Sequence, residues 1–285
     1  MMNLKDELRN IKLIVSDIDG TLVSDDGTIG TETKKLIKQL SELGVTFTLA
    51  TGRLHSAAEE IAKEIALEGP IISLDGSLIR TYPEDKIIYE NFIKHKYVNR
   101  ALKFAEENLF NIVLCHADKV YYTEQNTIIP ELLSKYGAIY EEVSSYNDYI
   151  NGTLEIVFTS DMKYALKKVA ERFIFPYSLG CSISFFRSQR RNNIFYLEVR
   201  KSGCSKGTAL KRVLKYLNIK TFEAAVLGDW YNDISLFDTK ALKVAVANAI
   251  PEILKKADII TSRTNNEEGA AEFFEMILRA KKGLL

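Results

Sequence analysis

The sequence predicts an α/β fold in which a doubly wound parallel sheet carries an inserted α+β domain. Apolar runs typical of buried strands alternate with amphipathic helical patterns at both ends of the chain. The middle of the chain instead shows neighbouring strands joined by short polar turns. Its 285 residues are enough for two modest domains. We therefore expect a discontinuous core at residues 1–83 and 194–285, with residues 84–193 inserted as a second domain.

In the first half, strands are expected where branched apolar residues run together, and helices where apolar residues recur on one face. The expected strands are Ile11–Ser16, Val45–Ala50 and Ile71–Leu74. One helix starts at Thr31 and stops before Gly44, which suits a left-handed C′ position. A second helix is expected at His55–Leu67, where the following Gly-Pro pair ends it.

The alternation resumes in the last third of the chain. The expected helices there are Lys206–Leu217, Ile234–Phe237 and Glu267–Arg279. The expected strands are Ala224–Leu227, Lys243–Val246 and Asp258–Thr261. Together with the first half, these elements predict a Rossmann-like core with helices on both faces of the sheet.

The middle of the chain predicts an α+β domain. Helical stretches are expected at Tyr97–Asn108 and Asp161–Phe173. The expected strands are Asn111–His116, Val120–Thr123, Leu154–Thr159, Cys181–Phe186 and Ile194–Val199. The turn Ala117-Asp118-Lys119 is short and polar, which indicates an antiparallel hairpin between the first two of these strands.

Composition argues against some classes of partner, although local charged patches can hide in a neutral total. Lys plus Arg number 38, as do Asp plus Glu, so the balance suggests neither a nucleic-acid footprint nor a polybasic membrane anchor. The three cysteines, Cys115, Cys181 and Cys204, are scattered and are expected to be reduced thiols. No signal-peptide pattern and no apolar run of membrane-spanning length occurs. We expect a cytoplasmic protein that is a monomer or a small homo-oligomer.

The segment Asp17-Ile18-Asp19-Gly20-Thr21-Leu22 follows the first expected strand. Ligands of open parallel sheets bind beyond the carboxyl ends of the strands, so both carboxylates are well placed. Two carboxylates two residues apart repel each other unless a cation compensates, and oxygen ligands favour a hard ion such as Mg²⁺. Acidic residues also occupy turns and helix caps, so this segment alone is a weak signal.

Three further polar segments occupy comparable positions. Each has an ordinary structural explanation, as a helix cap, a solvated lysine or a turn. Lys206 stands at a helix start, the wrong end for the helix dipole, where a bound phosphate would compensate. The segments are Thr51-Gly52-Arg53, Lys206-Gly207 and Gly228-Asp229-Trp230-Tyr231-Asn232-Asp233. Four such segments at strand ends or a helix start of one parallel sheet are better explained as one site.

The order Asp-x-Asp-Gly-Thr-Leu, Thr-Gly-Arg, Lys-Gly and Gly-Asp-x-x-Asn-Asp resembles the haloacid dehalogenase (HAD) superfamily. More narrowly, it is similar to Cof-type phosphatases, which carry a large α/β cap (type IIB, or C2B) between the second and third motifs. The resemblance covers nearly the whole chain. It implies a HAD-like core and a phosphoric monoester hydrolase that uses Mg²⁺ and an aspartyl-phosphate intermediate. Sugar phosphates or similar small phosphomonoesters are the implied substrates.

The resemblance also implies a role for each motif residue. Asp17 would be the nucleophile, and Asp19 the acid/base that protonates the leaving oxygen and then activates water. The residues implied around the metal are Asp17, Asp19 through its backbone carbonyl, Asp229 and Asp233. The residues implied to hold the phosphoryl group are Thr51, Gly52, Lys206 and Asn232.

Some positions depart from the common pattern of that family. Asp75-Gly76 stands where many relatives would carry Asn-Gly, and the extra carboxylate could weaken phosphate approach. Trp230 and Tyr231 are bulkier than usual and are expected to be packing residues, although they would narrow the site if they faced it.

The inserted domain offers few candidates for substrate recognition. Arg187, Arg190 and Arg191 could bind a second anionic group, although a solvated hairpin turn is the favoured explanation. The three histidines, His55, His95 and His116, show no metal-ligand spacing.

Other functions stay open at this point. The same aspartyl phosphate could pass to a sugar hydroxyl, as in a phosphomutase or phosphotransferase. A non-catalytic regulatory protein that binds a phosphometabolite is a third reading, although it would not need Asp17 and Asp19 together. A phosphate-accepting signalling domain lacks the large insertion, and the P-loop motif does not occur.

Overall fold

The computed structural model describes residues 3–126, 138–188 and 193–284. By their internal contacts the residues form two compact units. The first, here called the core unit, comprises Met1–Gly52, Ala58–Tyr89 and Ser205–Leu285. The second, the inserted unit, comprises Arg53–Ala57 and Glu90–Cys204. Each unit is described by itself below.

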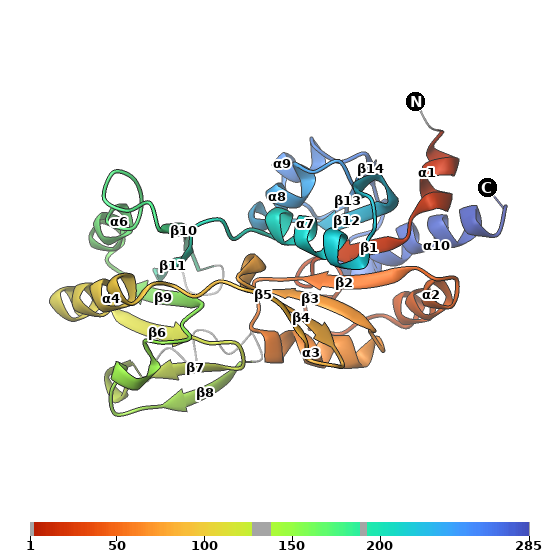
Figure 1. The fold of residues 1–285 in the computed structure, drawn as a ribbon. Helices are drawn as coiled ribbons and strands as arrows, with labels where there is room; N and C mark the ends of the chain where they lie inside the picture. The colour runs from red at the N-terminus through yellow and green to blue at the C-terminus, as the bar shows by residue number, and fades with distance from the viewer. Residues whose placement is uncertain (1–2, 127–137, 189–192, 285) are drawn as a thin grey trace. The chain divides into compact units, whose positions relative to one another are not determined.

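The core unit contains an eight-stranded sheet in the order β14-β13-β12-β1-β2-β3-β4-β5 (Figure 1). Its strands are β1 (Leu13–Ser16), β2 (Thr46–Ala50), β3 (Gly69–Ser73), β4 (Leu78–Tyr82), β5 (Ile87–Glu90), β12 (Ala224–Gly228), β13 (Leu242–Ala245) and β14 (Ile259–Ile260). The six strands from β14 to β3 run parallel, and β1 lies at the centre between β12 and β2. This confirms the predicted parallel sheet, to which an antiparallel β4 is added at the β3 edge.

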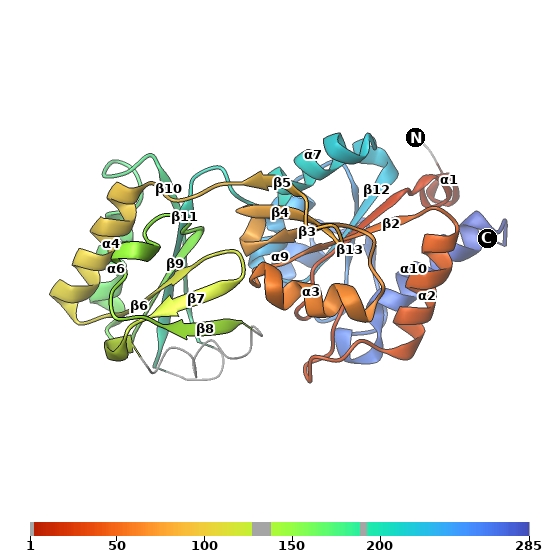
Figure 2. The ribbon, with the colours of Figure 1, turned by 60° about the horizontal axis from the view of Figure 1, so that its bottom comes forward.

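Helices cover both faces of this sheet, as predicted (Figure 2). They are α1 (Leu4–Asn10), α2 (Thr31–Glu42), α3 (His55–Glu64), α7 (Lys206–Leu217), α8 (Ile234–Phe237), α9 (Pro251–Leu254) and α10 (Gly269–Lys281). Because side chains alternate along a strand, β1 contributes to two separate cores. Ile14 packs in the cluster formed with α1, α2, α3 and α10. Leu13 and Val15 pack on the other face, in the cluster formed with α7, α8 and α9.

The inserted unit has a six-stranded sheet in the order β10-β11-β9-β6-β7-β8. Its strands are β6 (Asn111–Cys115), β7 (Lys119–Tyr122), β8 (Ile139–Glu142), β9 (Glu155–Ser160), β10 (Cys181–Arg187) and β11 (Phe195–Lys201). The predicted hairpin is present, since β6 and β7 pair in antiparallel fashion. Two helices, α4 (His95–Asn108) and α6 (Lys163–Glu171), pack against Ile156 and Phe158 of β9 in one apolar cluster.

The two units differ at their edges from the expected domain boundaries of 84–193 for the insertion. β5 belongs to the core sheet, because β4 and β5 are neighbours there. β11 belongs to the sheet of the inserted unit, where it pairs with β9 and β10. Pairing within each sheet therefore places both strands on the other side of the expected boundaries. The assignment of these units as independent domains stays a prediction.

Within the described ranges, no helix is both long and apolar enough to cross a membrane. Cys115 and Cys181 are buried free thiols, and Cys204 is a half-buried one. The cytoplasmic location and the monomeric or small homo-oligomeric state stay predictions.

Candidate active site

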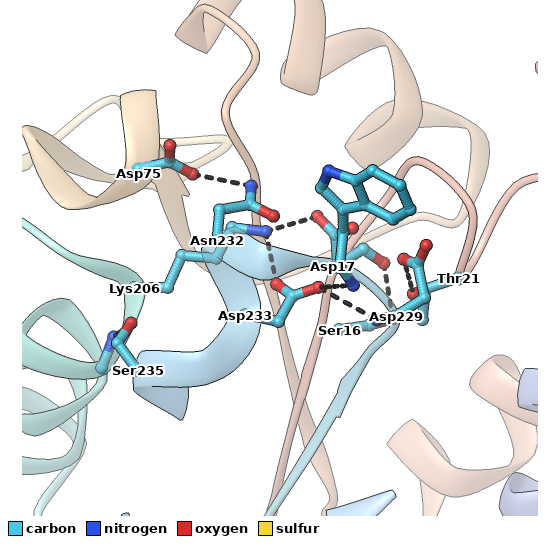
Figure 3. Close-up of polar contacts among 11 residues, drawn as sticks. Ser16, Asp17, Thr21, Asp75, Lys206, Asp229, Asn232, Asp233 and Ser235 are labelled. Carbon is cyan, nitrogen blue, oxygen red and sulfur yellow. Dashed lines mark hydrogen bonds and ion pairs between the residues drawn. The ribbon is translucent and has the colours of Figure 1, made fainter. Parts of the chain in front are cut away.

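The two central strands of the parallel part of the core sheet bring acidic residues together at their carboxyl ends (Figure 3). β1 and β12 pair in parallel with Ser16 opposite Leu227, so Asp17 and Asp229 follow neighbouring strand ends. The Asp17 amide extends the ladder by donating to the Leu227 carbonyl at 3.1 Å. This edge of an open parallel sheet is where ligands bind in such folds.

Asp233 completes a group of three buried carboxylates. Oxygen atoms of Asp17, Asp229 and Asp233 all lie within 4.8 Å of one another. Asp233 ends the short 3₁₀ helix η6 (Tyr231–Asp233), and its Oδ2 accepts from the Asp229 amide at 3.0 Å and the Trp230 amide at 3.1 Å. Glycine is required at Gly228, since a Cβ there would lie 2.6 Å from Asp233 Cγ. The backbone after β12 thus turns back to present Asp233 beside Asp229.

Lys206 is the cation of this site. It is the first residue of α7, which begins at a Ser205 N-cap, and its side chain is fully buried. Its Nζ donates to Asp17 Oδ1 at 2.6 Å and to Asp233 Oδ1 at 2.7 Å. These carboxylates offset the unfavourable position of a lysine at a helix start, a role that the sequence suggested for phosphate. The glycine after it lets α7 approach α8 closely, because a Cβ on Gly207 would lie 2.0 Å from the Ser235 carbonyl oxygen.

Burial and mutual repulsion shift the acidity of these groups. The pKa of Asp17 is raised well above its usual value, first by burial and then by the charge of Asp233, while Lys206 opposes the shift. Burial and Asp233 likewise raise the pKa of Asp229 to about 7. Burial lowers the pKa of Lys206, but the charges of Asp17 and Asp233 outweigh it, so the net shift is upward. The site is therefore short of positive charge.

The donor set fits a hard divalent cation. Three closely spaced carboxylates offer only oxygen atoms, which Mg²⁺ prefers, and an added cation would offset the repulsion that raises the pKa of Asp17 and Asp229. Among the described residues, the group that could hold a metal consists of Asp17, Asp229 and Asp233, and it includes neither a histidine nor Asp19. The Asp19 side chain is exposed, so its expected metal contact through the backbone carbonyl stays a prediction.

The turn after Asp19 packs directly against Asp229. Thr21 Oγ1 donates to Asp229 Oδ1 at 2.7 Å, and a Cβ on Gly20 would lie 2.6 Å from Asp229 Oδ2. Gly20 has φ of +78°, so glycine suits this position for both its backbone and its close contact. The Gly20 carbonyl accepts from Asn248 Nδ2 at 2.8 Å. Asn248 was not predicted from the sequence, because it lies 228 positions from Gly20 and belongs to none of the four motifs.

The residues implied to bind phosphate lie around the same sheet edge. Thr51 and Gly52 follow β2, the strand next to β1, and Thr51 is buried. Asn232 precedes Asp233 in η6, and its Nδ2 donates to Asp75 Oδ1 at 3.0 Å. The structure thus brings Lys206 into direct contact with the acidic group and joins Asn232 to Asp75. The roles of these residues toward phosphate stay predictions.

The bulky residues of the fourth motif are not buried packing residues. Trp230 is 43% exposed and Tyr231 is 55% exposed, so the expectation that they pack in the protein interior is wrong. Their rings contact each other edge to face at 5.4 Å. Trp230 is the N-cap of η6 and Tyr231 is its first residue, while Asp233 at its end reaches inward, and this leaves the two aromatic side chains on the surface.

The candidates of the inserted unit receive little support as ligands. Arg187 is exposed at the end of β10, while Arg190 and Arg191 lie outside the described residues. His116 Nε2 lies 2.9 Å from the Tyr149 carbonyl oxygen, 33 positions along the chain.

We expect Mg²⁺ to raise the melting temperature more at about pH 8 than at about pH 5. The folded, metal-free protein holds a proton on Asp229 up to a pKa of about 7, whereas an unfolded aspartate releases it near the usual value of 3.8. Metal-free stability from this group therefore falls as pH rises from about 4 to about 7, while Mg²⁺ binds the ionised form. Thermal unfolding in Mg²⁺ and in KCl of equal ionic strength measures the difference. Equal Mg²⁺ shifts at both pH values would contradict this expectation.

Known proteins similar to this chain include a family of hydrolases and two phosphatases. Residues 14–274 match the family described as haloacid dehalogenase-like hydrolase. Phosphatase YwpJ of Bacillus subtilis is 29% identical over an alignment of 294 residues that includes gaps. The alignment covers 94% of this chain and 100% of the relative. The 5-amino-6-(5-phospho-D-ribitylamino)uracil phosphatase YcsE of Bacillus subtilis is 28% identical over 274 residues, with 95% of this chain and 97% of the relative covered.

Solved structures agree in fold. A haloacid dehalogenase-like hydrolase from Bacteroides thetaiotaomicron superposes with a TM-score of 0.83 at 25% identity, covering 94% of this chain and 99% of the other. The predicted α/β fold is thereby confirmed, and the relatives support the predicted phosphatase role. Because residues 14–274, most of this chain, match the family, the chain belongs to the haloacid dehalogenase-like hydrolases.

Proposed function

We propose that this protein is an Mg²⁺-dependent phosphatase that hydrolyses small phosphomonoesters through an aspartyl phosphate on Asp17. The observation that carries the proposal is the contact of Lys206 Nζ with Asp17 Oδ1 at 2.6 Å, beside the carboxylates of Asp229 and Asp233. A carboxylate that attacks a phosphate dianion must first have its charge offset, and a buried ammonium does this. Mg²⁺, when bound among these carboxylates, would supply further neutralisation of the phosphoryl oxygens.

The chain's own residues suffice for the proton and bond changes. A carboxylate oxygen of Asp17 attacks phosphorus, the ester P–O bond breaks, and the leaving oxygen takes a proton from Asp19. Asp19, now ionised, then takes a proton from a water molecule whose oxygen attacks phosphorus. Inorganic phosphate leaves, and Asp17 regains its free carboxylate. The exposed side chain of Asp19 is suited to this role, since it must reach both the substrate and water.

The name of one relative supports a proposal for the substrate class. YcsE, a relative at 28% identity, is named for a phosphorylated ribityl compound, which is a small phosphomonoester. We propose sugar phosphates and related metabolites as the class to examine first. Transfer of the phosphoryl group to a sugar hydroxyl remains the second candidate, because it would use the same Asp17 and Lys206.

The test is release of inorganic phosphate from a panel of phosphorylated metabolites, with Mg²⁺ and then with EDTA. We expect release from several compounds in Mg²⁺ and none in EDTA. Failure to release phosphate from any compound, in folded protein that binds Mg²⁺, would contradict a phosphatase. Repeating the reaction with an acceptor sugar distinguishes hydrolysis from transfer, because transfer yields a new sugar phosphate in place of free phosphate.

A further inference from the structure

Asp75 occupies an unusual turn directly after β3. It lies in the 3₁₀ turn η1 (Leu74–Gly76) with φ of +48° and ψ of +34°, and Leu74 before it also has φ of +48°. Residues other than glycine seldom adopt this left-handed conformation, although Asp does so more readily than Leu. The Asp75 amide donates to the Thr51 carbonyl at 3.0 Å, which ties the turn to the end of β2. Backbone strain of this kind is typical of functional positions.

The Asp75 carboxylate lies among the groups that we propose for phosphate binding (Figure 3). Asn232 Nδ2 donates to its Oδ1 at 3.0 Å. It also lies beside Gly52, since a Cβ on that glycine would be 3.5 Å from Oδ1 and 3.7 Å from Oδ2. Its charge reaches Lys206 as well, where it helps to raise the lysine pKa. One buried carboxylate, 8% exposed, thus lies beside Gly52 and Asn232 and interacts electrostatically with Lys206.

We propose that Asp75 is a specificity-determining residue that weakens the binding of the phosphate dianion while it positions Asn232. A negative charge this close to Gly52, Asn232 and Lys206 opposes the approach of another anion, because screening by water is small at a buried position. The hydrogen bond to Asp75 also occupies one of the two amide protons of Asn232. Substrates must then gain affinity from contacts outside the phosphoryl group, and the phosphate product leaves readily. The inference rests on the proposed function, since it assumes that phosphate binds beside these residues.

The test separates charge from position. Asp75→Asn removes the charge but keeps the side-chain length and an oxygen that can accept from Asn232. We expect inorganic phosphate to bind the Mg²⁺-loaded variant about tenfold or more tightly than it binds wild type. The KM for a phosphomonoester should fall by a similar factor, with kcat changed by less than about twofold.

Asp85→Asn is the matched control. Asp85 also has a left-handed backbone, with φ of +52°, and its exposed carboxylate pairs with Arg80. Phosphate affinity and KM should stay at the wild-type values in this variant.

Calorimetric titration with inorganic phosphate needs no turnover, so equal affinities of wild type and Asp75→Asn would overturn the inference whether or not the protein is a phosphatase. A fall in kcat with KM unchanged would also overturn it. Absence of turnover in wild type would count against the proposed function alone.

Discussion

Asp17→Asn is expected to lose phosphate release by a factor on the order of 10³ or more, while the protein stays folded. Asparagine has the shape of aspartate but cannot form the aspartyl phosphate. The fold should survive, because the substitution removes a buried negative charge; burial, and then repulsion by Asp233 and Asp229, raise the pKa of Asp17. Initial rates in Mg²⁺ measure the loss, and circular dichroism with thermal unfolding checks the fold.

The matched control for Asp17→Asn is Asp6→Asn, which makes the same chemical change at an exposed position in α1. It should retain the wild-type rate. If Asp17→Asn keeps a rate comparable with wild type in purified, folded protein, the covalent mechanism is wrong. Loss of activity together with loss of the melting transition would instead show that Asp17 is needed for folding, against the electrostatic argument.

Lys206→Met should destabilise the metal-free protein by about 3–5 kcal/mol near pH 8, the usual cost of removing one partner of a buried ion pair. Methionine nearly fills the volume but leaves Asp17 and Asp233 without the ammonium that both contact. The loss should be smaller at about pH 5, because Asp17 can then take up a proton and relieve the repulsion. Because the pKa of Asp17 in the folded protein is raised above its usual value, the contribution of this carboxyl to stability falls as pH rises. The loss caused by Lys206→Met should therefore be larger at pH 8 than at pH 5.

Urea unfolding followed by the fluorescence of Trp230, the single tryptophan, measures the effect in the core unit. Lys211→Met, at an exposed position on the same helix, controls for the loss of a lysine from α7. Added Mg²⁺ should recover part of the stability of Lys206→Met by replacing the missing positive charge. An unchanged free energy of unfolding near pH 8, or a larger loss near pH 5, would contradict the electrostatic account.

The elements that sequence analysis found best are those with strong apolar patterns. α7 and α8 have the expected bounds, and β1, β2, β9 and β12 lie within two residues of expectation. Three strands were not predicted. β4 is mostly buried, whereas β5 and β8 are each exposed at both ends and only half-buried between. Such edge strands gain their stability from pairing with a neighbour rather than from a buried apolar face, so periodicity does not reveal them.

The chain order of the polar segments predicted which candidate residues lie together at one edge of the sheet. Asp17 follows β1, Thr51 follows β2 and Asp229 follows β12, and parallel strands carry their carboxyl ends to one edge of the sheet. Local pattern and parallel pairing together therefore predict that these residues are neighbours. The same reasoning predicted an unfavourably placed lysine at the start of α7 that needs an anionic partner.

Identifying that partner required the tertiary structure. Lys206 is 189 positions from Asp17 and 27 from Asp233, and its contacts depend on how α7 docks on the sheet. The link from Asp75 to Asn232 spans 157 positions. Sequence periodicity carries information about which face of an element is buried, but not about which distant side chains meet at hydrogen-bond distance. Residue types and strand order thus determine which chemical groups lie at this edge of the sheet. The packing of distant segments determines how the charges of these groups balance, because electrostatic interaction depends on separation in space.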